Sequence, residues 1–334
     1  MIELRKDPIS ARWVIINDTR DFQFDIPRRQ AQTETVGICP FCVGNEKLIP
    51  RPIACYDKDG NRISADSKNW HIKVIPNNKP ILTIEGNIIR KAEGLYDKMR
   101  GVGAHEIFIE SQEHDYVTMY NDRKNFITDT LALQDRINDL KNDIRLEYIL
   151  AYRNHGPFDG ETVIHPHFQL VALPIVPKAV KTEIDTARKY YDYKERCLFC
   201  DIIDQEISSK KRIVMENESF ISFIPFASRF PFETWVFPKE HTFDYRILND
   251  RDKIGAFAEI TIGVIRKLHK ALGRTLSYTL MLHSYPLKEN KMDYYHWHLE
   301  IVPRLTKYSG FDLISGMYVN PTIPEDSAKF LREI

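Results

Sequence analysis

Two sets of cysteine and histidine residues recur along the chain in the same order, and the step between the two histidines is 51 residues in the first set and 55 in the second. The first set is Cys39, Cys42, His114 and His165, and the second set is Cys197, Cys200, His241 and His296. Two thiolates and two imidazoles form a closed tetrahedral set that leaves no position for water, which is typical of structural zinc. We therefore predict a duplicated unit with one structural zinc ion in each half.

The paired cysteines have other possible uses, and the sequence leaves these open. A Cys-x-x-Cys pair opens a helix in thioredoxin-like redox proteins, and buried thiols also serve as small apolar side chains. Iron accepts imidazole and thiolate ligands as zinc does, and His283 and His298 are further ligand candidates for the second set. Zinc is favoured because each cysteine pair has remote histidine partners, which a redox pair does not need.

His167 and Gln169 lie two and four residues after His165, the last ligand candidate of the first set. Alternate residues of a strand face the same side, so His165, His167 and Gln169 are expected on one face. A neutral imidazole is a nucleophile toward phosphorus when a backbone carbonyl holds its other nitrogen. Gln169 does not titrate but offers an N–H to a phosphate oxygen, which favours group transfer over hydrolysis. We predict His167 as nucleophile, while a metal shared by His165 and His167 is the structural alternative.

The second half has His298 and Glu300 at the equivalent positions. A carboxylate in place of the glutamine repels a phosphate group. The second half is therefore predicted to be a degenerate repeat without an active centre. We place the two predicted domains at residues 1–180 and 190–334, joined by a charged, partly helical linker at 178–196.

The bulk composition excludes several classes of protein. The 334 residues suit two domains, and the 47 Lys and Arg residues balance the 47 Asp and Glu residues. No basic surplus indicates nucleic-acid binding, and no apolar stretch approaches a membrane span. The opening MIELRKDPIS lacks the apolar segment of a secretory signal. A cytoplasmic protein without disulfides is expected, with Cys55 as its unpaired cysteine.

Strand and helix patterns alternate in the same order in both halves, which predicts an α+β fold of antiparallel strands with one long helix per half. The expected strands are 12–16, 69–76, 103–110, 146–152, 162–173, 218–224, 234–237, 278–283 and 296–303. The expected long helices are 124–145 and 253–272, with a short one at 324–334.

The motifs resemble the galactose-1-phosphate uridylyltransferase family, a branch of the histidine-triad superfamily, over nearly the whole chain. The segments that carry the resemblance are Glu3–Pro8, Arg12–Val14, Cys39–Cys42, Val74–Asn77, Gly103–Glu106, Tyr152–Gly156, His165–His167, Gly310–Phe311 and Asn320–Glu325. The two Cys-x-x-Cys pairs are similar to the zinc-containing branch, which includes plant ADP-glucose phosphorylase. The resemblance implies two tandem histidine-triad-like domains, each an antiparallel sheet with a long helix.

The resemblance also implies a reaction. His167 would take a nucleotidyl group from a nucleotide sugar, Gln169 would hold that group, and a second acceptor would then remove it. UDP-glucose with galactose 1-phosphate is the first expectation, and an ADP-sugar with phosphate is the alternative. A homodimer is implied. The residues expected to contact substrate are Arg20, Asn77, Asn78, Asn154, Gly160, Thr162, Phe311 and Asn320.

Three positions depart from the family pattern. Phe168 replaces a small residue, Glu161 adds a carboxylate near the phosphates, and the second arginine expected after Arg20 is missing. These departures keep a rival open, namely a non-catalytic protein that binds zinc and nucleotides. Hydrolysis of nucleotidyl conjugates is a third possibility, against which Gln169 counts because related hydrolases carry a third histidine there.

Overall fold

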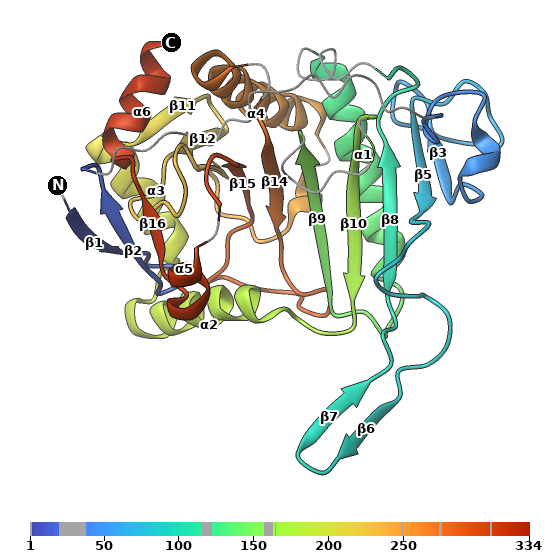
Figure 1. Ribbon diagram of the computed structural model, residues 1–334, viewed down its shortest axis with the longest axis horizontal. Coiled ribbons are helices and arrows are strands. Elements are labelled where there is room, and N and C mark those ends of the chain that lie inside the picture. The colour runs from blue at the N-terminus through green and yellow to red at the C-terminus, as the bar shows by residue number, and fades with distance from the viewer. Residues whose placement is uncertain are drawn as a thin grey trace.

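The computed structural model describes residues 2–19, 38–114, 122–156, 163, 165–248, 250–273, 276–307 and 309–334. A long antiparallel sheet of 11 strands runs through this part of the chain (Figure 1). Its strands in spatial order are β11 (Ile213–Glu216), β12 (Phe220–Phe223), β13 (Thr234–Pro238), β15 (His298–Pro303), β14 (Tyr278–His283), β9 (Tyr148–His155), β10 (His167–Leu173), β8 (Ala104–Ile109), β5 (Ile72–Pro76), β3 (Ala54–Tyr56) and β4 (Arg62–Ile63).

The sheet contains the predicted repeat, and the predicted α+β fold is confirmed. Outward from the centre, β9, β10, β8, β5 and β3 of the first half match β14, β15, β13, β12 and β11 of the second. The halves meet where β9 pairs with β14, with Tyr152 opposite Met281. The two halves therefore share one continuous sheet. The predicted domain boundary between 180 and 190 falls within helix α2 (Lys178–Lys194), and the division into domains stays a prediction.

Two long helices cover one face of the sheet. They are α1 (Arg123–Leu140) and α4 (Arg251–Leu272), and each begins after an aspartate whose side chain accepts from the backbone of the first turn. Their apolar sides share one core with Phe108 and Phe168 of the sheet. Because alternate residues of a strand point to opposite faces, His167 and Gln169 lie on the face that these helices leave uncovered.

The first strands of the chain join its last segments. Strands β1 (Ile2–Lys6) and β2 (Trp13–Asn17) form a small sheet with β16 (Tyr318–Asn320), in which β16 runs parallel to β2. Arg5 also pairs with Glu325 at 2.9 Å. The described residues also form the α-helices α3 (Leu198–Ser209), α5 (Gly310–Ser315) and α6 (Pro324–Glu333). Across the described ranges, none of the helices combines the length and apolar character that spanning a bilayer demands.

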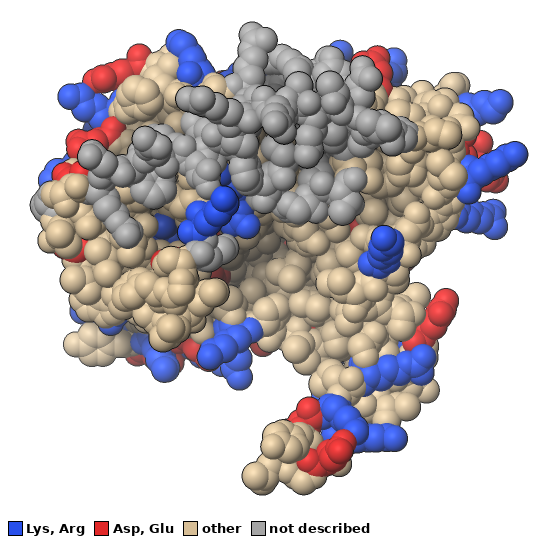
Figure 2. Space-filling model, viewed as in Figure 1, with Lys and Arg blue, Asp and Glu red and all other residues tan. Residues whose placement is uncertain are grey.

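A hairpin of β6 (Arg90–Glu93) and β7 (Tyr96–Met99) stands away from the body of the molecule (Figure 1). Both signs of charge lie on its surface (Figure 2), and Lys98 pairs with Glu93 across it. Its tip residue Leu95 is 99% exposed. The hairpin therefore adds nothing to the apolar core that supports the site.

Candidate active site

The first predicted metal set converges in space. Cys39 Sγ lies 3.7 Å from His165 Nδ1, and Cys42 Sγ lies 3.6 Å from the same nitrogen and 3.4 Å from His114 Nδ1. A tetrahedral zinc ion separates sulfur and nitrogen ligands by roughly 3.6 Å, given its usual bond lengths. All four ligand atoms lie within 4.8 Å of one another. The donor set and its spacing therefore fit a structural zinc ion.

A backbone carbonyl orients each of the two histidine rings, His165 and His167. His165 Nε2 donates to the Ser111 carbonyl at 2.8 Å, which leaves the lone pair on Nδ1 for the metal. His167 Nδ1 donates to the His165 carbonyl at 2.8 Å, so its lone pair is on Nε2. Burial lowers the pKa of His167 to about 4, although the same carbonyl contact opposes that shift. The His167 ring is thus oriented and uncharged near neutral pH.

Gln169 is held by residues of the neighbouring strands. Its Oε1 lies 2.8 Å from His105 Nε2 and accepts from the Tyr152 hydroxyl at 3.1 Å. Sequence reasoning missed both of these neighbours, although both lie within segments that carry the family resemblance. Phe168 stacks on Phe108 in the core with ring centroids 4.2 Å apart, so it points away from His167 and Gln169. This departure from the family pattern does not narrow the site.

The other predicted substrate residues are spread over several elements. Asn77 follows β5, and its Nδ2 lies 3.1 Å from His105 Nε2, whereas Asn78 Nδ2 donates to the Leu48 carbonyl at 3.3 Å. Asn154 lies in β9 and pairs across the sheet with Thr279. Arg20, Gly160 and Thr162 lie outside the described residues.

The C-terminal candidates lie on a different part of the fold. Phe311 is 46% exposed on α5. Asn320 is buried in β16, where its Nδ2 donates to the Ser228 carbonyl at 3.0 Å and its Oδ1 accepts from Thr322 N at 2.9 Å. These contacts use both ends of the Asn320 amide within the chain. Contact of either residue with a sugar stays a prediction.

The second metal set repeats the geometry of the first. Cys200 Sγ lies 3.3 Å from His241 Nδ1 and 3.8 Å from His296 Nδ1, and Cys197 completes a group within 4.8 Å. This donor set also fits zinc. The contact between His298 Nδ1 and the His296 carbonyl is 3.3 Å, compared with 2.8 Å at His167. The second half therefore keeps the metal geometry but holds its last histidine less tightly.

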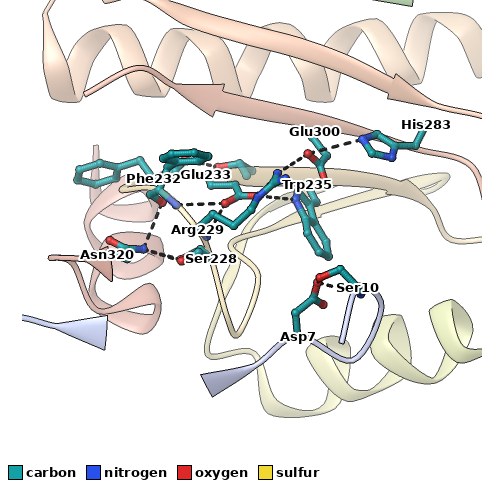
Figure 3. Close-up of polar contacts among 12 residues, drawn as sticks. Asp7, Ser10, Ser228, Arg229, Phe232, Glu233, Trp235, His283, Glu300 and Asn320 are labelled. Atoms are coloured by element: carbon teal, nitrogen blue, oxygen red, sulfur yellow. Dashed lines mark hydrogen bonds and ion pairs between the residues drawn. The ribbon is translucent and has the colours of Figure 1, made fainter. Parts of the chain in front are cut away.

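Glu300 of the second half takes part in a buried ion-pair network (Figure 3). Arg229 pairs with Glu300 and lies 2.6 Å from Glu233, to which Trp235 Nε1 also donates at 3.0 Å. His283 Nε2 lies 3.6 Å from Glu300. Two buried carboxylates therefore stand where the first half has neutral side chains, an arrangement that repels a phosphate group.

Glu183, His283 and His298 form a further group of ligand types. One ligand atom of each lies within 4.8 Å of the others, and His283 Nδ1 lies 3.2 Å from Glu183. Burial lowers the pKa of His283, but Glu183 and Glu300 outweigh it and raise the pKa to about 10. His283 and His298, which the sequence left open as ligands of the second metal set, thus belong to a separate cluster. His241 and His296 lie with the two cysteines of that set.

Two buried acids, Glu110 and Asp129, lie close to Arg153, the residue before Asn154 in β9. Arg153 Nη1 donates to Glu110 Oε1 at 3.0 Å, and Asp129 of α1 lies in the same buried group. The Glu110 backbone N–H also donates to the Pro166 carbonyl at 3.1 Å. Burial raises the pKa of Glu110 to about 7 and raises the pKa of Asp129, against the opposing effect of Arg153. One guanidinium therefore supports two carboxyl groups, which favours a retained proton.

Replacing Asp129 with asparagine is expected to weaken the pH dependence of stability. The folded state holds protons that the unfolded chain loses near pH 4–4.5, so stability declines as pH rises from about 4.5 to about 7. The decline is about 1.4 kcal/mol per pH unit for each retained proton. Asp129→Asn removes one carboxyl group, so its stability relative to wild type should increase over that window. Urea unfolding midpoints at a series of pH values measure this, and parallel curves would contradict it.

Comparison with known proteins extends over both halves. The family model for the C-terminal domain of galactose-1-phosphate uridyl transferase matches residues 183–316, and a domain of unknown function, the DUF4931 N-terminal domain, matches residues 77–176. ADP-glucose phosphorylase of Arabidopsis thaliana is 32% identical over 99% of this chain and 93% of its own length. Galactose-1-phosphate uridylyltransferase of Thermotoga maritima is 26% identical over 100% of this chain and 98% of its own. A crystal structure of the Arabidopsis phosphorylase with bound ADP-glucose has a TM-score of 0.82 and 30% identity, covering 100% of this chain and 99% of that one.

Proposed function

The chain belongs to the galactose-1-phosphate uridylyltransferase family and is a nucleotidyltransferase, and on that premise we propose that it transfers a nucleoside monophosphate from a nucleotide sugar through a covalent bond to His167. The observation that carries the proposal is the oriented imidazole. Its Nδ1 donates to a backbone carbonyl, and burial keeps its pKa at about 4. A neutral ring with its lone pair on Nε2 is suited to attack phosphorus at neutral pH.

The proposed reaction has two displacements at the same phosphorus. His167 Nε2 attacks the α-phosphorus, the bond to the bridging oxygen breaks, and a sugar 1-phosphate leaves with the electron pair. An oxygen of the phosphate acceptor then attacks, and the bond between phosphorus and Nε2 breaks. Gln169 donates to a non-bridging oxygen as negative charge develops. Zinc bound at Cys39, Cys42, His114 and His165 would supply structural support for the segment that ends at His167.

The comparisons support two different nucleotide sugars as the donor of the nucleotidyl group. The 32% identity to ADP-glucose phosphorylase and the likeness to its complex with ADP-glucose support an ADP-sugar as donor and phosphate as acceptor. The 26% identity to a galactose-1-phosphate uridylyltransferase supports UDP-glucose and galactose 1-phosphate instead. We favour the ADP-sugar because the higher identity extends over nearly the full length of both chains.

Incubation with ADP-glucose or UDP-glucose, without an acceptor, tests the mechanism and the donor together. Intact-mass spectrometry at neutral pH should show one added adenylyl group, formed faster than the uridylyl adduct. Phosphate added afterwards should discharge the adduct and release ADP. Faster uridylylation, discharged by galactose 1-phosphate, would assign the uridylyltransferase reaction. Nucleotide binding without an adduct from either donor would overturn the proposed covalent mechanism through His167.

A further inference from the structure

The sequence analysis assigned no role to His105, yet this residue contacts Gln169 directly. We propose that His105 is a positioning residue for the transfer reaction and that it acts by fixing the orientation of the Gln169 amide. This inference rests on the proposed function, since Gln169 is taken to stabilise the transferring phosphoryl group. His105 lies in β8, 7% exposed, on the same face of the sheet as Gln169.

The backbone sets the tautomer of His105. The Ile81 backbone N–H donates to His105 Nδ1 at 3.3 Å, and a backbone N–H can only donate. Nδ1 therefore carries the lone pair, and the proton of the neutral ring is on Nε2. That nitrogen lies 2.8 Å from Gln169 Oε1, so the Nε2–H donates to the amide oxygen.

The amide oxygen of Gln169 has two lone pairs, and both have donors. His105 occupies one, and the Tyr152 hydroxyl donates to the other at 3.1 Å. The two N–H groups of the same amide are then directed away from these partners and are available to a phosphate oxygen. Rotation of the amide by a half-turn would place its NH2 group against the His105 N–H, donor against donor. His105 thereby disfavours the orientation that would present an oxygen to the phosphate.

His105 also connects Gln169 to the segment that the family resemblance assigns to the nucleoside. The Asn77 backbone N–H donates to the His105 carbonyl at 2.8 Å. Asn77 Nδ2, which is itself a donor, lies 3.1 Å from His105 Nε2, farther than the acceptor Gln169 Oε1 at 2.8 Å, so the Nε2–H is assigned to Gln169. The Asn77 side-chain oxygen is already held by the Lys79 N–H at 2.8 Å. The 77–81 segment therefore contacts the His105 ring that orients Gln169. If a nucleoside binds at this segment, His105 lies between the nucleoside and Gln169.

The internal repeat supports a joint role for His105 and Gln169. The strand registers make Glu233 equivalent to His105 and Glu300 equivalent to Gln169. Both members of the pair differ between the halves, and the acidic pair is bridged by Arg229 instead of by a direct hydrogen bond. The half that we propose to be catalytic thus has a neutral donor and acceptor pair where the other half has two acidic side chains joined by an arginine.

The test is a double-mutant cycle on adduct formation. His105→Leu removes the donor, His105→Gln keeps an N–H near the Nε2 position, and Gln169→Ala removes the group that His105 is proposed to orient. The single-turnover rate of nucleotidyl-His167 formation from ADP-glucose should fall about 10- to 100-fold in His105→Leu, with most of the rate recovered in His105→Gln. In the Gln169→Ala background, His105→Leu should cost less than about threefold, because the interaction is already absent.

Two results would overturn the proposal: an unchanged rate in His105→Leu, or a loss of equal size with and without Gln169. Nitrogen NMR of wild-type His105 gives a readout independent of activity and of the folding of any variant. A proton on Nε2 supports the proposal, and a proton on Nδ1 with a bare Nε2 overturns it. Failure of the wild-type protein to form any adduct would count against the His167 mechanism, while the tautomer would still decide whether His105 holds the amide.

Discussion

His167→Asn is expected to abolish covalent nucleotidyl transfer while leaving the fold and the metal content unchanged. Asparagine can still donate to the His165 carbonyl, but it has no ring nitrogen with which to attack phosphorus. Turnover should fall by roughly four orders of magnitude or more, as expected for the loss of a nucleophile. Intact-mass spectrometry after incubation with the better nucleotide sugar should show no adduct, and circular dichroism should match wild type.

His298→Asn is the matched control, because His298 has the equivalent place in the second half. It too lies two residues after a metal-ligand candidate, His296, and its Nδ1 lies 3.3 Å from the His296 carbonyl oxygen. Adduct formation should continue in this variant. An adduct that survives in His167→Asn and disappears in His298→Asn would move the active centre to the second half.

Cys42→Ser is expected to reduce both stability and catalysis. Removal of one thiolate opens the closed ligand set, so the protein should lose one of two zinc ions. Loss of a structural metal should lower the free energy of unfolding by at least about 3 kcal/mol. His165 would lose the bond that orients its carbonyl toward His167 Nδ1, so adduct formation should slow by about 10- to 100-fold. Metal analysis, thermal unfolding and the single-turnover rate measure the three effects.

Cys200→Ser separates the structural effect from the catalytic one. It opens the second set in the same way, and it should lose one zinc ion and a comparable amount of stability. Because that set fixes His298 and leaves His167 in place, adduct formation should stay within about threefold of wild type at a temperature where both variants are folded. Equal losses of rate in the two variants would show that the first metal set has no special role in positioning the nucleophile.

Local periodicity was sufficient to predict which side chains of β10 share a face. Because a strand has a period of two, the sequence predicted His167 and Gln169 on one face, and in the structure Phe168 between them packs on the opposite face against Phe108. That strand was predicted from residue 162, which lies outside the described residues; β10 begins at His167, and the described residues 163, 165 and 166 precede it without strand structure. His165 lies in the bend before it, where its Nδ1 turns toward the two cysteines.

Contacts between strands were beyond the reach of the sequence pattern. His105 and Tyr152 meet Gln169 only because of the register of β8 and β9 against β10, which depends on the assembled sheet. The same limit applies to Arg229, whose pairing with Glu300 brings together residues 71 positions apart. The resemblance likewise implied a sheet for each half, whereas the pairing of β9 with β14 merges them.

The pairing of β2 with β16 has a consequence for synthesis of the chain on the ribosome. The buried side chains of β2, Val14 and Ile16, pack with Ala227, Tyr318 and Ile323, all of which are translated much later. At about 5–20 residues per second, the roughly 300 residues between the two strands take on the order of 15–60 s to make. During that time β2 has one edge without its final partner and an apolar face without its final cover. The first strands of the nascent chain are therefore open to chaperone binding, or to misassociation with a neighbouring chain, until the end of the chain has been made.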